Sequence, residues 1–176
     1  MSKKSGFFFI LSCLVFGLFV FSYPAKLYPQ EFNVSPAQSI QSFIDNDLAN
    51  SDEIDYILIG PGTYEEQIII NITQNKEIHL IGNSYENTII SLPSGITGNV
   101  ISADGGGTIY LENVKITNGT RSGILNKNST IIFLKNVLIE NNSSTFGGGI
   151  NNIGTIIINK CIIKDNLCNL NGGGIY

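Results

Sequence analysis

The chain has 176 residues and a net charge of −4 at pH 7, and charged residues make up only 14% of it. It contains a single arginine, a single histidine and no tryptophan. This length has room for one domain, and so weak a negative charge gives no electrostatic reason to expect a nucleic-acid partner. The side chains that most often catalyse reactions or bind ligands are therefore scarce.

Residues 1–22 have the composition of a signal peptide. Two lysines near the start form a basic region, residues 7–21 form an apolar run, and small residues permit cleavage before Tyr23. An uncleaved anchor is the alternative, because the apolar run is only slightly shorter than the ~18 residues that a membrane span needs. We therefore expect an exported protein, secreted or at the cell surface. It would contact a membrane only through this segment or through an anchor beyond residue 176.

Cleavage of the signal segment would leave Cys161 and Cys168 in the mature chain. Export permits a disulfide, but two cysteines seven residues apart define no disulfide framework. Cys161 also stands where the repeat described below has valine, which predicts a small core residue. We assign neither cysteine a catalytic role.

Two segments precede the repeats. Residues 23–35 contain two prolines and no apolar periodicity, which is typical of a linker. Residues 36–49 predict a short amphipathic helix, with Ser35 as its N-cap and Pro36 at its first position. The apolar face of that helix follows spacings of three and four residues and consists of Ile40, Phe43, Ile44 and Leu48.

From residue 55 onward, short β-rich runs alternate with Gly, Asn and Pro turns, and the pattern repeats. Residues 108–118 match residues 131–141, and both match residues 155–165. Each unit has room for three strands of three to five residues and contains no helical stretch. The equivalent positions are Val114, Val137 and Cys161, spaced 23 and 24; Val100, Ile124, Ile150 and Ile175, spaced 24, 26 and 25; and Ile57 and Leu80, spaced 23.

A period of about 23–25 residues predicts a solenoid, because one unit cannot bury its apolar side chains until it stacks on the next. The regular leucine pattern of leucine-rich repeats is absent. We therefore predict an all-β fold over residues 36–176, a right-handed parallel β-helix with an N-terminal capping α-helix. The chain stops five residues into a new unit, and an unfinished unit leaves an open sheet edge, so we expect it to be truncated.

Asparagine and glycine mark the corners of each unit. Asn113 and Asn136 separate two strands, with Asn159 one place out of register, and asparagine tolerates the left-handed conformation that a tight bend needs. Amides at such positions are expected to stack between units. The glycine runs 147–149 and 172–174 precede inward isoleucines, where glycine allows close packing. A phosphate-binding loop would need a following helix, and none follows.

The same register pairs opposite charges on neighbouring strands. Glu112 is expected beside Lys135, and Glu140 beside Lys164, since parallel strands lie ~4.8 Å apart. Such exposed pairs contribute little net stability.

Residues 57–66, 78–82 and 87–90 resemble the first coils of the pectin-lyase-like right-handed β-helix superfamily. A helix caps the N-terminal end in that superfamily, and residues 36–49 stand at its place. The spacing of Gly62, Tyr64 and Glu66 resembles the opening motif of pectin methylesterases. The Gly-Gly-Gly-Ile and Ile-x-x-Asn phrases are similar to repeats of polymorphic outer-membrane and adhesin-like surface proteins, where Gly-Gly-Ala-Ile and Phe-x-x-Asn are usual. The resemblance covers residues 36–176 and implies a fold more than a function.

The candidate polar residues do not form a recognisable catalytic set. No carboxylate recurs with a partner that would place two on one face, as glycosidic acid–base chemistry requires. Tyr64 and Glu66 are predicted to be a packing and turn element, His79 a hydrogen-bonded structural histidine, and Arg121 a solvated loop residue. We assign no catalytic, cofactor-binding or metal-binding residue and no cofactor. The candidates considered are Asp104, Glu112, Glu140, Asp165 and Arg121.

These observations favour a secreted or surface-displayed, adhesin-like β-helix protein without catalysis in this part of the chain. Its expected partners are polysaccharides or cell-surface glycans. The alternative is a carbohydrate-active enzyme, similar to pectate lyases or pectin methylesterases, whose catalytic coils lie beyond residue 176. A periplasmic accessory protein that handles metal or sugar is a third alternative, for which a lone histidine gives little support.

Overall fold

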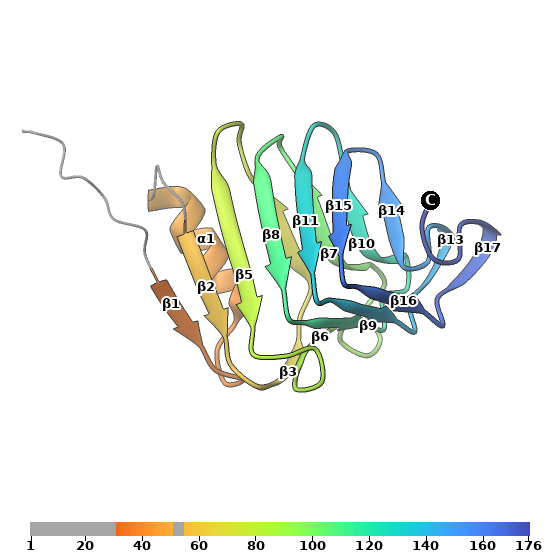
Figure 1. The fold of residues 1–176 in the computed structure, drawn as a ribbon. Coiled ribbons are helices and arrows are strands. Elements are labelled where there is room, and N and C mark those ends of the chain that lie inside the picture. Colours follow the sequence, from red (N-terminus) through yellow and green to blue (C-terminus); the bar gives the residue numbers. More distant parts are fainter. Residues whose placement is uncertain (1–30, 51–54) are drawn as a thin grey trace, which may run out of the picture.

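A computed structural model of the chain describes residues 31–50 and 55–176, which form a parallel β-solenoid of about six turns (Figure 1). The predicted signal peptide and the first part of the predicted linker lie outside these residues. Within the described ranges, no helix combines the length and the apolar character that crossing a membrane requires. One turn of the solenoid is called a coil below.

Three parallel sheets run along the solenoid, and each takes one short strand from successive coils. Sheet A contains β1 (Glu31–Val34), β2 (Asp55–Ile59), β5 (Glu77–Gly82), β8 (Thr108–Glu112), β11 (Ile131–Lys135) and β15 (Thr155–Asn159). Sheet B contains β3 (Gly62–Glu65), β6 (Thr88–Ser91), β9 (Lys115–Thr117), β12 (Leu138–Glu140) and β16 (Ile162–Lys164). Sheet C contains β4 (Ile68–Asn71), β7 (Asn99–Asp104), β10 (Ser122–Asn126) and β14 (Ile150–Asn152), and a further pair joins β13 (Ser143–Phe146) to β17 (Leu167–Asn171).

The strand register confirms the predicted repeat, with one correction. Residues 108, 131 and 155 lie side by side in sheet A, and Ile57 pairs with Leu80. In sheet C, however, Ile124 pairs with Ile101 and not with Val100, so this step is 23 residues. Val100 and Ile101, the second and third residues of β7, are both buried. Because burial does not alternate there, the sequence pattern leaves the register ambiguous by one residue.

The capping helix is present but begins later than predicted. α1 spans Ile40–Asn50, and its N-cap is Ser39, whose hydroxyl accepts a hydrogen bond from the Ser42 N–H at 3.2 Å. Ser35 instead binds the Gln38 side chain in a turn before the helix. Ile40 and Ile44 are fully buried, so the helix closes the N-terminal end of the core (Figure 1).

The last four residues of the predicted linker before Ser35 are also ordered, because they pair with β2 as strand β1. Val34 belongs to the buried core, and Phe32 packs against it. The four residues of β1 alternate between polar and apolar side chains, a signal that the prediction of a linker overlooked.

The corners of each coil have the predicted left-handed backbone. Asn113 and Asn136 have φ of 57° and 51°, and the Asn136 side-chain N–H donates to the Asn113 Oδ1 at 3.1 Å. In the next coil Lys160 takes this position, with φ of 53°, which explains why Asn159 is out of register. A second left-handed corner follows sheet B, at Asn118, Asn141 and Asp165.

The glycine runs have the expected structural role. Gly147 has φ of +60°, and a Cβ atom there would lie 2.2 Å from the Ile150 carbonyl oxygen. A Cβ on Gly149 would lie 2.6 Å from the Gly174 carbonyl oxygen of the next coil. Ile150 itself is fully buried. A side chain at Gly147 would therefore clash within its own coil, and one at Gly149 would push successive coils apart.

Both described cysteines are free thiols and half-buried. Cys161 packs against the core as predicted, although it is less covered than Val114 and Val137, its equivalents in earlier coils.

Candidate functional site

The carboxylates considered as catalytic candidates are spread over different sheets and corners. Asp104 ends β7, where its Oδ1 accepts hydrogen bonds from the Gly105 N–H at 2.8 Å and from the Asn128 side chain. Asp165 is exposed at a left-handed corner. Both residues therefore serve the backbone turns in which they lie.

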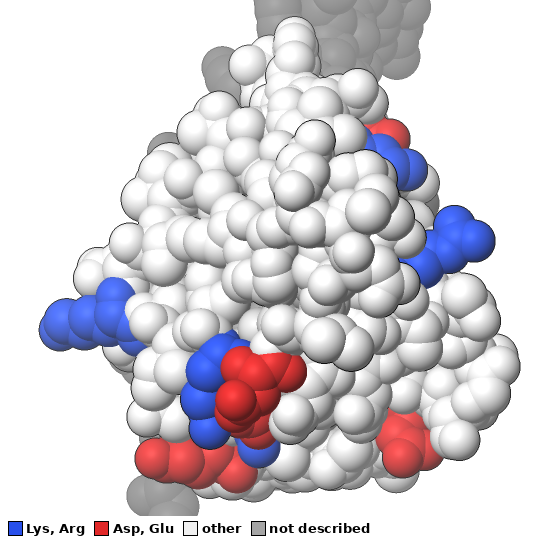
Figure 2. Space-filling view, turned by 90° about the vertical axis from the view of Figure 1, so that its right-hand side faces the viewer, with Lys and Arg blue, Asp and Glu red and all other residues white. Residues whose placement is uncertain are grey.

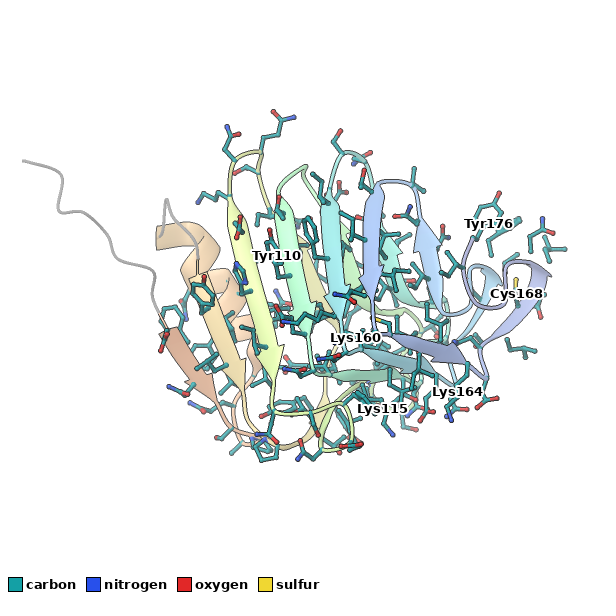
Figure 3. The ribbon with its side chains drawn as sticks, in the orientation of Figure 1. Tyr110, Lys115, Lys160, Lys164, Cys168 and Tyr176 are labelled. Atoms are coloured by element: carbon teal, nitrogen blue, oxygen red, sulfur yellow. The ribbon has the colours of Figure 1, made fainter. Side chains whose placement is uncertain are left out.

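Glu112 and Glu140 form the predicted ion pairs on sheets A and B. Glu112 lies 2.7 Å from Lys135. Glu140 lies 3.2 Å from Lys164 and, on its other side, 3.2 Å from Lys115, a partner that the sequence did not indicate. The two lysines are labelled in Figure 3. Partial burial would raise the pKa of the Glu140 carboxyl, but the hydrogen bonds and charges of the two lysines outweigh it and lower that pKa. Within the described part of the chain, no three His, Cys, Asp or Glu side chains are grouped as a metal site.

Tyr64 and Glu66 fasten the capping helix and the first coil together. The buried Tyr64 hydroxyl lies 3.0 Å from the Val34 carbonyl oxygen and 2.9 Å from that of Gly60. Burial raises the pKa of Tyr64, and the nearby Glu66 charge raises it further. The Glu66 carboxylate accepts hydrogen bonds from the N–H groups of Ile40 and Gln41, at 2.8 and 3.1 Å. An anion at a helix N-terminus satisfies free N–H groups and opposes the helix dipole, so this is the packing and turn element that the sequence predicted.

His79 belongs to an aromatic ladder on the outer side of sheet A. Its ring stacks between Tyr56 and Tyr110, with centroids 4.4 and 4.2 Å away, and Tyr110 stacks on Phe133 at 4.6 Å (Tyr110 is labelled in Figure 3). Its Nε2 lies 2.7 Å from the Glu77 Oε1, which agrees with a hydrogen-bonded structural role. The sequence places an aromatic ring at each of these four register positions. That pattern could have predicted the ladder, but it was not recognised in the sequence.

The ladder stabilises the sheet and is poorly suited to hold a sugar. A sugar ring packs on the face of an aromatic ring, but here the faces cover one another, with interplanar angles of 2° and 6° at Tyr110. The outer face of Phe133 is followed in register by Ile157. Stacked aromatic pairs of this kind contribute about 0.5–1.5 kcal/mol each beyond their area burial.

A groove beside sheet C is a better candidate for binding. Its volume is about 440 Å³, larger than the hollow of about 340 Å³ at the start of sheets A and B or the hollow of about 190 Å³ at the end of the ladder. It follows the outer side of β10 and β14 and the corners before them. The groove is lined by Asn99, Thr120, Arg121, Ser122, Leu125, Ser144, Thr145, Phe146 and Asn151.

Arg121, the single arginine of the chain, is the only charged residue in this lining. Its backbone N–H is held by the Gly98 carbonyl oxygen at 3.0 Å. Its guanidinium is exposed and makes no ion pair or hydrogen bond with the residues that the structure describes. The prediction that Arg121 is a solvated loop residue is therefore confirmed by its exposure. The sequence did not indicate the groove around this side chain.

The rest of the lining combines hydroxyl and amide groups with two apolar side chains. The Ser122 hydroxyl donates to the Arg121 carbonyl oxygen at 2.5 Å and lies 3.4 Å from the Ser144 hydroxyl. The Asn151 Oδ1 is buried without a hydrogen-bond partner in the described structure. Leu125 and Phe146 supply the apolar surface. Such a lining suits a ligand that carries many hydroxyl groups, apolar C–H faces and an anion.

Comparison with known proteins does not add a family to this description. No family model matches the chain, and neither the curated proteins nor the solved structures contain a match. The structure therefore assigns the chain a parallel β-solenoid fold and does not assign it a family.

Proposed function

We propose that the protein is an exported, non-catalytic β-solenoid of the adhesin-like kind that binds polysaccharide in the groove beside sheet C. The observation that carries the proposal is the unpaired Arg121 guanidinium among hydroxyl and amide groups, in a lining without a carboxylate. Export is supported by the composition of residues 1–22. Binding without catalysis agrees with the scattered carboxylates.

The chemistry of the groove defines how such a ligand would be held. The planar guanidinium of Arg121 matches a carboxylate with two parallel hydrogen bonds. Serine and threonine hydroxyls both donate and accept, so they can pair with sugar hydroxyl groups. Leu125 and Phe146 would cover the apolar face of a sugar ring. A polysaccharide with acidic units fits all three features.

The finer structural assignment is part of the same proposal. We infer right-handed winding, because connections between parallel strands of one sheet are right-handed in ~98% of cases. The likeness of the first coils to pectin-lyase-like proteins, and of the glycine phrases to surface-protein repeats, supports this winding. The enzyme alternative lacks a supporting observation here, since no two of the candidate carboxylates are neighbours in the strand register.

Calorimetric titration with an acidic oligosaccharide, such as an oligogalacturonate, and a neutral oligosaccharide of equal length tests the proposal. We expect Arg121→Gln to weaken the acidic ligand about tenfold, or ~1.4 kcal/mol, and to leave the neutral ligand almost unchanged. Lys127→Gln is the matched control, because Lys127 is an exposed cation outside the groove. Absence of binding, or equal losses in both variants, would refute the site. Release of unsaturated sugars or methanol would refute the non-catalytic assignment.

A further inference from the structure

Six asparagines of the chain stand in the sequence Asn-x-Ser/Thr, which is the acceptor motif for N-linked glycans in exported proteins. In none of the six is the middle residue proline, which would prevent modification. The inference drawn from them rests on the export proposed above, because only exported chains meet the enzymes that use this motif. The six are Asn33, Asn71, Asn118, Asn128, Asn141 and Asn142.

The fold excludes one of these asparagines as a glycan carrier. Asn142 is 1% exposed. Its Nδ2 lies 3.2 Å from the Ile116 carbonyl oxygen and 3.0 Å from that of Glu140. A sugar chain on this nitrogen would have to stand between coils and would break these contacts. The other five asparagines are exposed, so burial separates the motifs that the fold tolerates in modified form from the one that it does not.

Three of the exposed motifs are less suitable than the others. Asn33 lies within strand β1, which pairs along its length with β2, whereas N-linked glycans belong on surface loops. Asn118 and Asn141 occupy the same left-handed corner in successive coils, only ~4.8 Å apart, so a glycan on one would crowd the other. Thr120, which completes the first of these two motifs, also lines the groove beside sheet C.

The two remaining motifs lie in turns along one edge of the solenoid, where the chain passes from sheet C to sheet A (upper edge in Figure 1). Asn71 ends β4, and its motif continues into the turn before β5. Asn128 lies in the turn between β10 and β11, with φ of 51°, and both of its chain neighbours are exposed. Two coils separate the motifs, or about 10 Å, and neither contributes to the lining of the groove.

Modification of these two nitrogens agrees with their hydrogen bonds. The transferase uses a sugar chain linked to a lipid phosphate. A bond forms between Nδ2 and the first sugar carbon, the bond from that carbon to the phosphate oxygen breaks, and Nδ2 loses one proton to a base of the enzyme. The second hydrogen stays on Nδ2, so Asn128 can still donate to the Asp104 Oδ1. The exposed Asn71 side chain forms no hydrogen bond with the residues that the structure describes, so none is lost there.

Glycans would also compensate for a surface that is poor in charge. Charged residues make up 14% of the chain, whereas about a quarter is usual for soluble domains. Figure 2 shows only a few Lys, Arg, Asp and Glu side chains on the face that it views. N-linked glycans are bulky and solubilising, so they supply the hydration that charged side chains supply in other proteins.

We propose that the exported protein carries N-linked glycans on Asn71 and Asn128, along the edge between sheets C and A, and none on Asn142. Both glycans would point away from the groove beside sheet C. The proposal therefore leaves that groove open to the polysaccharide.

Mass mapping of peptides from the protein purified from its natural source tests the proposal. We expect a glycan on the peptides that contain Asn71 and Asn128. In a eukaryotic host that secretes and glycosylates the full chain, Asn128→Gln and Thr73→Val should each remove one glycan, whereas Thr73→Ser keeps the hydroxyl group and should keep the glycan. The control Asn75→Gln should remove none, because Asn75 is an exposed, left-handed residue of the same turn but lies outside a motif.

The same preparation separates failure of the glycan sites from failure of export. Protein that is recovered from the medium or the cell surface without glycans at both positions would overturn the sites and leave export intact. Protein that stays inside the cell would overturn export and the sites with it. A glycan on Asn142, glycans confined to the other exposed motifs, or loss of a glycan in the Asn75→Gln control would each overturn the assignment.

Discussion

Replacing Asn142 by alanine tests whether buried amides hold the corner between sheets B and C. The Asn142 side chain is 1% exposed. Its Oδ1 accepts a hydrogen bond from the Gly119 N–H at 2.8 Å, and its Nδ2 lies 3.2 Å from the Ile116 carbonyl oxygen and 3.0 Å from the Asn166 Oδ1. One amide thus links three successive coils.

The expected loss follows from these contacts. Alanine leaves the buried Gly119 N–H without its partner, which costs about 1–3 kcal/mol, and it removes further hydrogen bonds that contribute about 1 kcal/mol each. We therefore expect Asn142→Ala to lower the free energy of unfolding by about 3 kcal/mol. Urea unfolding followed by far-ultraviolet circular dichroism measures the change as a shift in midpoint at constant slope.

The matched control is Asn87→Ala. Asn87 is exposed, and its side chain donates only to the Asn83 Oδ1 at 3.0 Å, so the expected change is within about 0.5 kcal/mol. If the two variants lose the same stability, the buried amide does not hold the corner, and the argument from its hydrogen bonds is wrong.

Two further predictions concern charged groups. Glu66→Ala should lower the free energy of unfolding by about 1–2 kcal/mol, because it removes the hydrogen-bond acceptor at the N-terminus of α1. Hydrogen exchange should show the loss of protection in residues 40–46 first. Unchanged exchange in these residues would contradict the capping role of Glu66. Glu140→Gln should lower stability by about 1 kcal/mol at neutral pH. The folded-state pKa of Glu140 is lowered, so its contribution is present above the unfolded-state pKa and disappears as the pH falls through the folded-state value. Urea unfolding of wild type and variant should therefore converge in acid, and a difference that grows in acid would contradict the sign.

The fold could be predicted from the sequence because the same chemistry recurs at each coil. An inward isoleucine or leucine returns about every 23 residues, and in a parallel stack such residues must lie on one another. Pairs such as Glu112 with Lys135 and Asn113 with Asn136 follow from that register alone. Where neighbouring residues are both buried, as at Val100 and Ile101, the pattern loses its alternation, and the register could not be settled from sequence.

The candidate site could not be predicted in the same way. Arg121 looks like an isolated loop residue in the sequence, and its groove exists because Asn99 and Asn151 of neighbouring coils lie beside it. The start of α1 was missed for a similar reason, since part of its cap is Glu66, which is distant in the chain.

The sequence by itself determined the solenoid, its period and most of its register, because these depend on a repeated local pattern. Only the tertiary structure decided which non-repeated side chains share a surface, because that depends on the corner geometry of every coil between them.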